Sequence, residues 1–150
     1  MEALAKEGYM SPYVTMSVQS QRAQHLADQI VLDLDTEVCE LTAVQEALIM
    51  KTERLIKRLG GTYRKLIETL DSDIAYSFEP MVLMIPTQNK LQIRCLSLLS
   101  AFDETIIAID SAWLNRKIST RQRGKAIRQL EGRVYRAIEQ LNRQENVNAE

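Results

Sequence analysis

The sequence predicts a mainly α-helical fold with two short β-strands, in which a strand-helix-helix unit occurs twice. The stretches SPYVTMS at 11–17 and EPMVLMI at 79–85 are rich in apolar residues and bounded by turn residues, as short strands are. Each is followed by two longer stretches with helical periodicity. Three residue types also recur at one constant offset: Pro12, Val14 and Met16 in the first stretch, and Pro80, Val82 and Met84 in the second. We interpret the two halves as an internal duplication.

The chain of 150 residues is expected to form a single domain, 1–150. The first unit would span about 12–71 and the second about 79–142, with a disordered N-terminal arm at 1–10 and a disordered C-terminal tail at 143–150. Hydrophobic residues make up 45% of the chain and charged residues 26%, which is ordinary for a globular protein. No apolar run is long enough to cross a bilayer and the first residues lack a signal-peptide pattern, so we expect a cytoplasmic protein without membrane contact.

The first unit begins with a half-buried strand from Tyr13 to Val18. Alternation places Val14, Met16 and Val18 toward the core and Tyr13, Thr15 and Ser17 toward solvent. Ser20 is a plausible N-cap for the helix that follows. That helix has one apolar face, formed by Ala23, Leu26, Ala27, Ile30 and Val31. Thr36 could cap the next helix.

The second helix of the first unit carries an apolar stripe from Val44 to Leu70. Gly60 and Gly61 fall inside it and would each cost roughly 1 kcal/mol relative to alanine. Because the stripe keeps its phase across the glycines, we favour one bent helix over two helices. The small residues could also let another backbone approach closely.

The second unit begins with a strand from Pro80 to Ile85, which is apolar on both faces and would be buried or form part of a dimer interface. Thr87 can cap the third helix, whose apolar stripe runs from Leu91 to Ile109. Ser119 and Thr120 open the fourth helix, which has Ile127, Leu130, Val134, Ile138 and Leu141 on its inner face.

A short strand needs a partner, and pairing two equivalent strands over four helices gives a ribbon-helix-helix arrangement. Such a ribbon fits the major groove of DNA. The side chains that would read bases are the polar ones facing away from the core, namely Tyr13, Thr15, Ser17 and Gln19. The alternative is an ordinary exposed strand face.

The charges of this chain are strongly polarised. Ala23 to Met50 contains acidic residues but no lysine or arginine, whereas Trp113 to Arg143 contains nine lysines and arginines against Glu131 and Glu139. A helix N-terminus beside such a cluster favours anions, so we expect DNA phosphates to bind there. The candidate phosphate-binding residues are Arg22, Arg116, Lys117, Ser119, Thr120, Arg121, Arg123, Lys125 and Arg128. A solvated basic helix face is the alternative, and it explains a second cluster, at Lys51 to Lys65, about as well.

Three blocks of the sequence also resemble a known family: VTMSVQSQRAQHL, EPMVLMIPTQ with SLLSAFDETIIAI, and NRKISTRQRGKAIRQLEGRVYRAIEQL. They are similar to the AcaB-like family of regulators from conjugative plasmids and integrating conjugative elements, over about Tyr13 to Leu141. The resemblance implies a ribbon-helix-helix DNA-binding protein that activates transfer genes.

No residue pattern points to catalysis, a metal or a cofactor, so we do not expect an enzyme. His25 is the single histidine and has no nearby nucleophile, and Cys39 and Cys95 are expected to be buried free thiols. Asp33 and Asp35 lack the ligand spacing of a calcium loop, and a polar turn between helices explains them better.

Three functional hypotheses remain. The first is a sequence-specific transcriptional regulator that binds a promoter site on duplex DNA as a homodimer or higher oligomer, with RNA polymerase or another regulator as a possible partner. The second is a helical accessory protein of the transfer machinery that binds a protein partner, for which the acidic stretch Asp28 to Glu46 is a candidate surface. The third is a DNA-binding accessory protein that organises a transfer origin.

Overall fold

The computed structural model describes residues 13–34, 41–68 and 81–149. In this part of the chain the fold is mostly helical, with four helices and one two-stranded sheet. The elements in chain order are β1 (Tyr13–Val18), α2 (Gln21–Asp33), α3 (Ala43–Ile67), β2 (Met81–Pro86), α4 (Lys90–Leu114) and α5 (Thr120–Ala149). The expected arm at 1–10 lies outside the described residues, as do Thr36 and Cys39.

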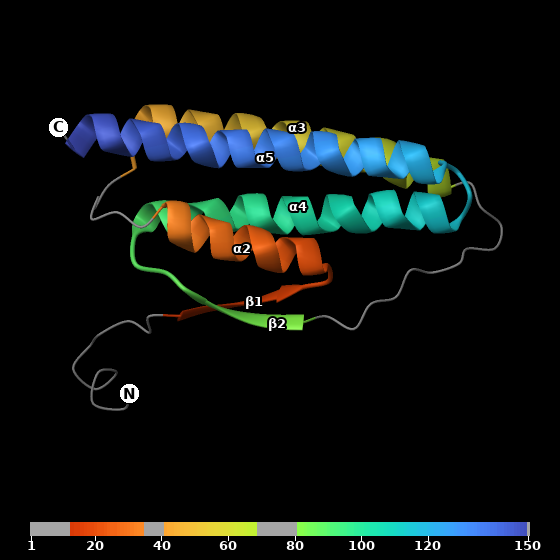
Figure 1. Ribbon diagram of the computed structural model, residues 1–150, viewed down its shortest axis with the longest axis horizontal. Coiled ribbons are helices and arrows are strands. Elements are labelled where there is room, and N and C mark those ends of the chain that lie inside the picture. Colours follow the sequence, from red (N-terminus) through yellow and green to blue (C-terminus); the bar gives the residue numbers. More distant parts are fainter. Residues whose placement is uncertain (1–12, 35–40, 69–80, 150) are drawn as a thin grey trace.

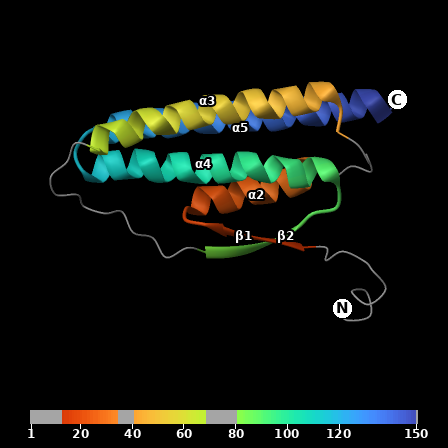
Figure 2. The same ribbon diagram turned by 180° about the vertical axis from the view of Figure 1, so that it is seen from behind.

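The elements form three layers, which Figures 1 and 2 show from opposite sides. Helices α3 and α5 form the outer helical layer, α4 and α2 form the middle layer, and the sheet lies beneath α4 and α2. Accordingly, α3 packs on α4 and α5, while α2 packs on α4, α5 and β2. The core fills the space between the layers, with Leu98, Phe102 and Ile106 of α4 fully or almost fully buried.

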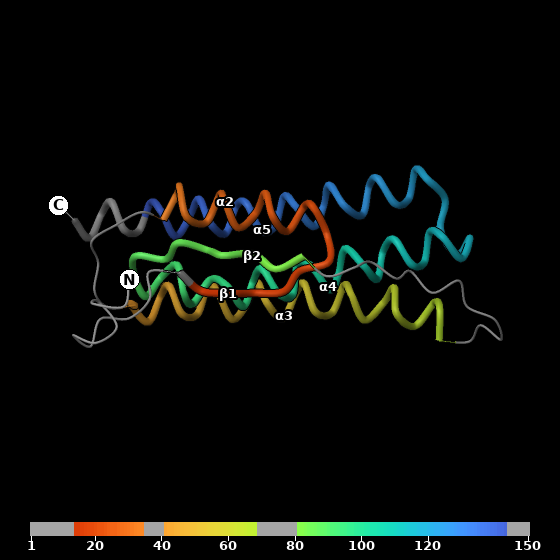
Figure 3. The backbone as a smooth tube through the Cα atoms, turned by 90° about the horizontal axis from the view of Figure 1, so that it is seen from below, coloured from red at the N-terminus to blue at the C-terminus, as the bar shows by residue number. Residues whose placement is uncertain are grey.

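The two strands pair with each other inside one chain, in antiparallel register. Thr15 lies opposite Met84, and Ser17 lies opposite Val82. The predicted alternation of β1 is confirmed, because Val18 is buried and Thr15 and Ser17 are exposed. Figure 3, seen from below, shows the sheet in front of the helices, so its outer face is open.

The prediction of a ribbon-helix-helix fold built from a β-α-α unit repeated twice is wrong. The register shows why the repeat fails: Val14 faces the helices, whereas Val82, its match in the supposed duplication, is 66% exposed on the outer face. Side chains alternate along a strand, so matched residues on opposite faces cannot be structural equivalents. The helices differ as well, since α2 has 13 residues and α4 has 25.

Local sequence signals explain most helix ends. The Ser20 hydroxyl accepts a hydrogen bond from the Ala23 amide and caps α2, as predicted. Helix α4 is capped by Asn89 and not by Thr87, because the Asn89 side chain accepts from the Gln92 amide and also donates to the Leu34 carbonyl at the end of α2. Helix α5 continues to Ala149, so residues 143–149 are helical where the sequence predicts a disordered tail.

Helix α3 passes through Gly60 without interruption, which confirms one helix instead of two. A Cβ atom at Gly60 would stand 2.8 Å from the Thr105 hydroxyl oxygen of α4. That hydroxyl is buried and donates to the Ala101 carbonyl at 2.8 Å, so it cannot move away freely. Gly60 therefore permits the close packing of α3 on α4.

Gly60→Ala is expected to lower the free energy of unfolding by about 1–3 kcal/mol, because the added methyl group overpacks the α3–α4 contact. Gly61→Ala is the matched control: its Cβ would meet only the flexible Arg64 side chain, at 4.0 Å. It should raise stability by about 0.5–1 kcal/mol through helix propensity. Urea unfolding of both variants checks this, and equal effects at the two positions would contradict the assignment of Gly60 as the contact point.

Candidate nucleic-acid interface

The open face of the sheet is half polar and half apolar. Thr15 and Ser17 of β1 are exposed on this face, and Met84 and Val82 of β2, each 66% exposed, lie opposite them. The inner face is apolar, with Ile85 buried and Met16 and Leu83 packed against the core. Helices hold the sheet from one side only, so hydroxyls and methyl groups are presented together on a narrow exposed ribbon.

The end of β1 is fixed to the helical core by a buried carboxylate. Asp103 of α4 is 7% exposed and accepts hydrogen bonds from the Gln19 amide at 2.9 Å and the Ser20 amide at 2.8 Å. Both amides lie at the N-terminal end of α2, where backbone N–H groups have no carbonyl acceptor within the helix. Asp103 thus sets the direction of the chain as it leaves β1. Gln19, the fourth predicted base-reading residue, follows the strand and lines a groove with Arg64 and Asp103.

The turn between α4 and α5 has an unusual backbone at Arg116. Its φ is +59°, a left-handed conformation that usually belongs to glycine. The Lys117 amide donates to the Ala112 carbonyl and the Arg116 amide to the Trp113 carbonyl, which is the Schellman pattern of a helix end. A non-glycine residue in this conformation lowers stability by roughly 1 kcal/mol. Because Arg116 is exposed and adopts this conformation nonetheless, we regard it as a candidate functional residue.

Two of the predicted phosphate-binding arginines are engaged in ion pairs. Arg22 of α2 pairs with Glu131 of α5 at 2.7 Å. Arg123 pairs with Asp110 of α4 at 2.6 Å, and its guanidinium lies 4.7 Å from the centroid of the Trp113 ring. Both side chains line a surface groove of about 520 Å³ at the start of α2, together with His25. Arg22 thus joins α2 to α5, and Arg123 joins α5 to α4, apart from any contact they make with a ligand.

The other predicted phosphate-binding residues gather at the start of α5. Ser119 caps the helix through a reciprocal pair with Gln122, and the Thr120 hydroxyl accepts from the Trp113 indole. The remaining five are exposed cations: Arg116, Lys117, Arg121, Lys125 and Arg128. The cations and a helix N-terminus therefore lie together, as the sequence predicts.

The sheet and the start of α5 do not form one surface. Helix α5 lies in the layer farthest from the sheet, with α4 and α2 between them (Figure 1). The groove at the start of α2, lined by Arg22 and Arg123, lies between α2, α4 and α5, since it is built from residues of all three helices. The predicted base-reading side chains of β1 and the exposed cations at the start of α5 thus belong to separate parts of the molecule.

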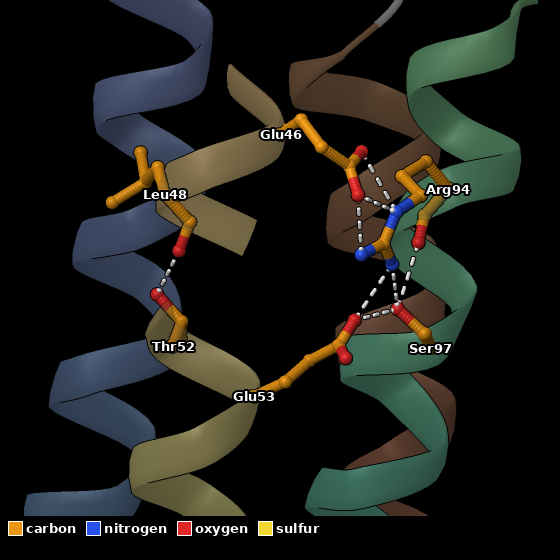
Figure 4. A network of polar contacts seen from close by, with 6 residues as sticks. All are labelled: Glu46, Leu48, Thr52, Glu53, Arg94 and Ser97. Atoms are coloured by element: carbon orange, nitrogen blue, oxygen red, sulfur yellow. Dashed lines mark hydrogen bonds and ion pairs between the residues drawn. The ribbon is translucent and has the colours of Figure 1, made fainter. Parts of the chain in front are cut away.

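Sequence reasoning missed the polar groups that hold the site in shape. Asp103 sits inside an apolar stretch of α4 with no local signal for its role. Arg94 of α4 binds two carboxylates of α3, Glu46 and Glu53, which are more than 40 residues away in the chain (Figure 4). Cys95 is buried and free, and burial raises the pKa of its thiol to about 12, so it stays protonated at neutral pH.

No family model and no curated protein sequence matches this chain. Among solved structures, the chain is similar to the crystal structure of selenomethionine-containing AcaB from uropathogenic E. coli. The match covers 91% of this chain and 81% of that chain, with a TM-score of 0.66 and 19% sequence identity. The chain therefore shares the fold of AcaB. Within the described residues, no helix combines the length and the hydropathy needed to cross a bilayer.

Proposed function

We propose that this protein is a non-enzymatic, DNA-binding regulator that reads duplex DNA with the open face of its two-stranded sheet. The observation that carries the proposal is the exposure of Thr15 and Ser17 on a sheet whose other face is held by helices. The major groove admits a two-stranded ribbon, and hydroxyl groups can donate to or accept from base edges. The apolar side chains opposite them, Met84 and Val82, can contact thymine methyl groups.

The shared fold with AcaB and the sequence resemblance support a more specific form of this proposal. On that basis the regulated genes are conjugative-transfer genes, the effect is activation, and the protein binds a promoter site as a homodimer in the bacterial cytoplasm. Two-fold symmetry of the protein would require a palindromic site. The exposed cations at the start of α5 would contact phosphates without reading sequence.

The test compares binding to a selected duplex with binding to an unrelated duplex. The double variant Thr15→Ala, Ser17→Ala is expected to lower the preference for the selected duplex about tenfold or more, since it removes the exposed hydroxyls of Thr15 and Ser17. Arg116→Gly is the matched variant, because glycine suits the positive φ and only the cation is lost. It should weaken both duplexes alike and reduce the salt slope by about one.

Equal weakening of both duplexes by the double variant would contradict base reading by β1. If the double variant bound both duplexes as tightly as wild type, the sheet would not be part of the DNA interface.

The exposed apolar half of the sheet favours a second candidate function, docking of a protein partner. Val82 and Met84 line a groove of about 350 Å³ between β2 and α2, together with Asp28 of the acidic stretch. An accessory protein of the transfer machinery would use this groove for a partner with a basic, apolar segment. Substitution of both residues by serine would then abolish partner binding and leave DNA affinity unchanged, whereas the regulator would lose DNA affinity.

A further inference from the structure

The outer helical layer has a groove of its own, on the side away from the rest of the molecule. It has a volume of about 250 Å³ and is lined by residues of α3 and α5 alone: Leu48, Lys51, Thr52, Leu55, Arg133, Arg136, Ala137 and Gln140. The two helices run in opposite directions in Figure 1, which brings the first half of α3 beside the second half of α5. Three exposed cations from distant parts of the chain, Lys51, Arg133 and Arg136, therefore line one groove.

The described acidic side chains of α3 and α5 each pair with an arginine. Figure 4 shows Glu46 and Glu53 of α3 turned toward Arg94 of α4, whereas Thr52 lies on the side of α5. On α5, Glu131 pairs with Arg22 of α2, and Glu139 pairs with Arg143. Three of these ion pairs join two layers and the fourth lies within α5, so the four carboxylates are engaged by arginines that do not line the groove. The cations of the groove therefore give it a positive charge.

Arg136 is held in place for such a role. Its Nε donates to the Gly132 carbonyl at 3.0 Å, and a Cβ atom at Gly132 would stand 3.3 Å from one of its terminal nitrogens. The guanidinium therefore lies over the glycine with its other N–H groups available. A fixed guanidinium beside two further cations suits the phosphodiester groups of a nucleic-acid backbone.

We propose that the α3–α5 groove is a second DNA-binding surface, which contacts phosphates of a second duplex without reading its sequence. The proposal rests on the proposed function, because it takes the sheet as the first DNA-binding surface. The sheet and the α3–α5 layer lie on opposite sides of the α2–α4 layer (Figures 1 and 2). Because residues of α3 and α5 alone line the groove, one straight duplex cannot contact both the sheet and the groove. The protein would then bridge two duplexes, for example two distant sites on one DNA molecule.

The test is a bridging assay in which an immobilised duplex carrying the selected site captures a free fluorescent duplex of unrelated sequence through the protein. The groove variant is Lys51→Gln, Arg133→Gln, Arg136→Gln. The control variant is Arg54→Gln, Lys57→Gln, Lys65→Gln, which removes the same charge from exposed positions that do not line the groove. Thermal unfolding should be unchanged in both variants, since all six side chains are exposed.

The groove variant is expected to lose at least tenfold in capture, while its affinity for the selected duplex, which the sheet binds, stays unchanged. Its salt slope for the unrelated duplex should fall by roughly three, in line with three lost phosphate contacts. Capture equal to wild type, or an equal loss in the control variant, would overturn the groove as a DNA-binding surface.

The two proposals fail in different ways. A wild-type protein without sequence preference, whose binding to any duplex still depends on Lys51, Arg133 and Arg136, would contradict base reading by the sheet but retain the groove. A wild-type protein that binds no duplex at low salt would overturn both.

Discussion

Asp103→Ala is expected to lower the free energy of unfolding by about 2–4 kcal/mol, one of the two largest effects of a single substitution outside the apolar core. The carboxylate is 7% exposed and accepts from the backbone amides of Gln19 and Ser20 at the junction of β1 and α2. Removing it leaves the buried N–H group of Ser20 and the partly buried N–H group of Gln19 without an acceptor, and a buried group of this kind costs about 1–3 kcal/mol. Urea unfolding followed by circular dichroism measures the change.

Two variants sharpen this prediction. Asp103→Asn keeps one oxygen that can accept from either amide, so its loss should be about half that of alanine. Glu104→Ala, one residue further along α4 at an exposed position, should change stability by less than about 0.5 kcal/mol. A loss of similar size at Glu104 would mean that α4 tolerates no substitution here and that the junction is not specifically held by Asp103.

The same substitution bears on DNA binding. Asp103 fixes the chain just after Ser17, so its loss would allow the end of β1 to move relative to the core. At a temperature where the variant is still folded, the preference for the selected duplex should fall further than binding to unrelated DNA.

Arg94→Met is expected to lower the free energy of unfolding by about 2–3 kcal/mol at neutral pH. Arg94 binds Glu46 through Nε and Glu53 through a terminal nitrogen, and the Ser97 hydroxyl also donates to Glu53 (Figure 4). Hydrogen bonds to Glu46 raise the pKa of Arg94, so it stays charged throughout the stability range. Methionine keeps most of the side-chain volume but leaves the Glu53 carboxylate partly buried without its cation.

The cost of Arg94→Met should depend on pH. Burial acts to raise the pKa of Glu53, but hydrogen bonds from Ser97 and Arg94 and the charges of Arg94 and Lys57 outweigh it and hold the pKa below that of an ordinary glutamate. A carboxyl whose pKa is lowered by folding adds stability above its unfolded pKa, and that stability is lost as the pH falls through the folded pKa. The difference between wild type and variant should therefore be largest above pH 5 and shrink below about pH 4.5.

Urea unfolding at several pH values tests this, with Glu46→Gln as the milder comparison because Glu46 is more exposed than Glu53. A difference that grows on acidification would contradict the Arg94–Glu53 pairing as the cause.

The sequence predicts well what local periodicity and capping determine. The bounds of β1, the exposed side chains Thr15 and Ser17, and the caps at Ser20 and Ser119 all follow from short-range patterns. The continuous helix across Gly60 follows from the unbroken phase of its apolar stripe. These features depend on residues a few positions apart, which the sequence shows directly.

The sequence cannot show partners that come from distant segments. The cap of α4 falls at Asn89 because that side chain also reaches the Leu34 carbonyl, 55 residues away. The supposed duplication fails because strand pairing fixes which face each residue occupies, and the register between β1 and β2 appears only in three dimensions. Arg22 was a candidate phosphate contact from its charge alone, and its pairing with Glu131, 109 residues away, is likewise invisible in the sequence.

The central claim, that the open sheet face reads duplex DNA, is tested most directly by selecting binding sites from a random duplex library at near-physiological salt. Wild type and the double variant Thr15→Ala, Ser17→Ala are selected in parallel. We expect wild type to enrich a palindromic site, and the double variant to retain salt-dependent DNA binding but to lose the enrichment. The same site enriched equally by both proteins, or no enrichment by either, would contradict it.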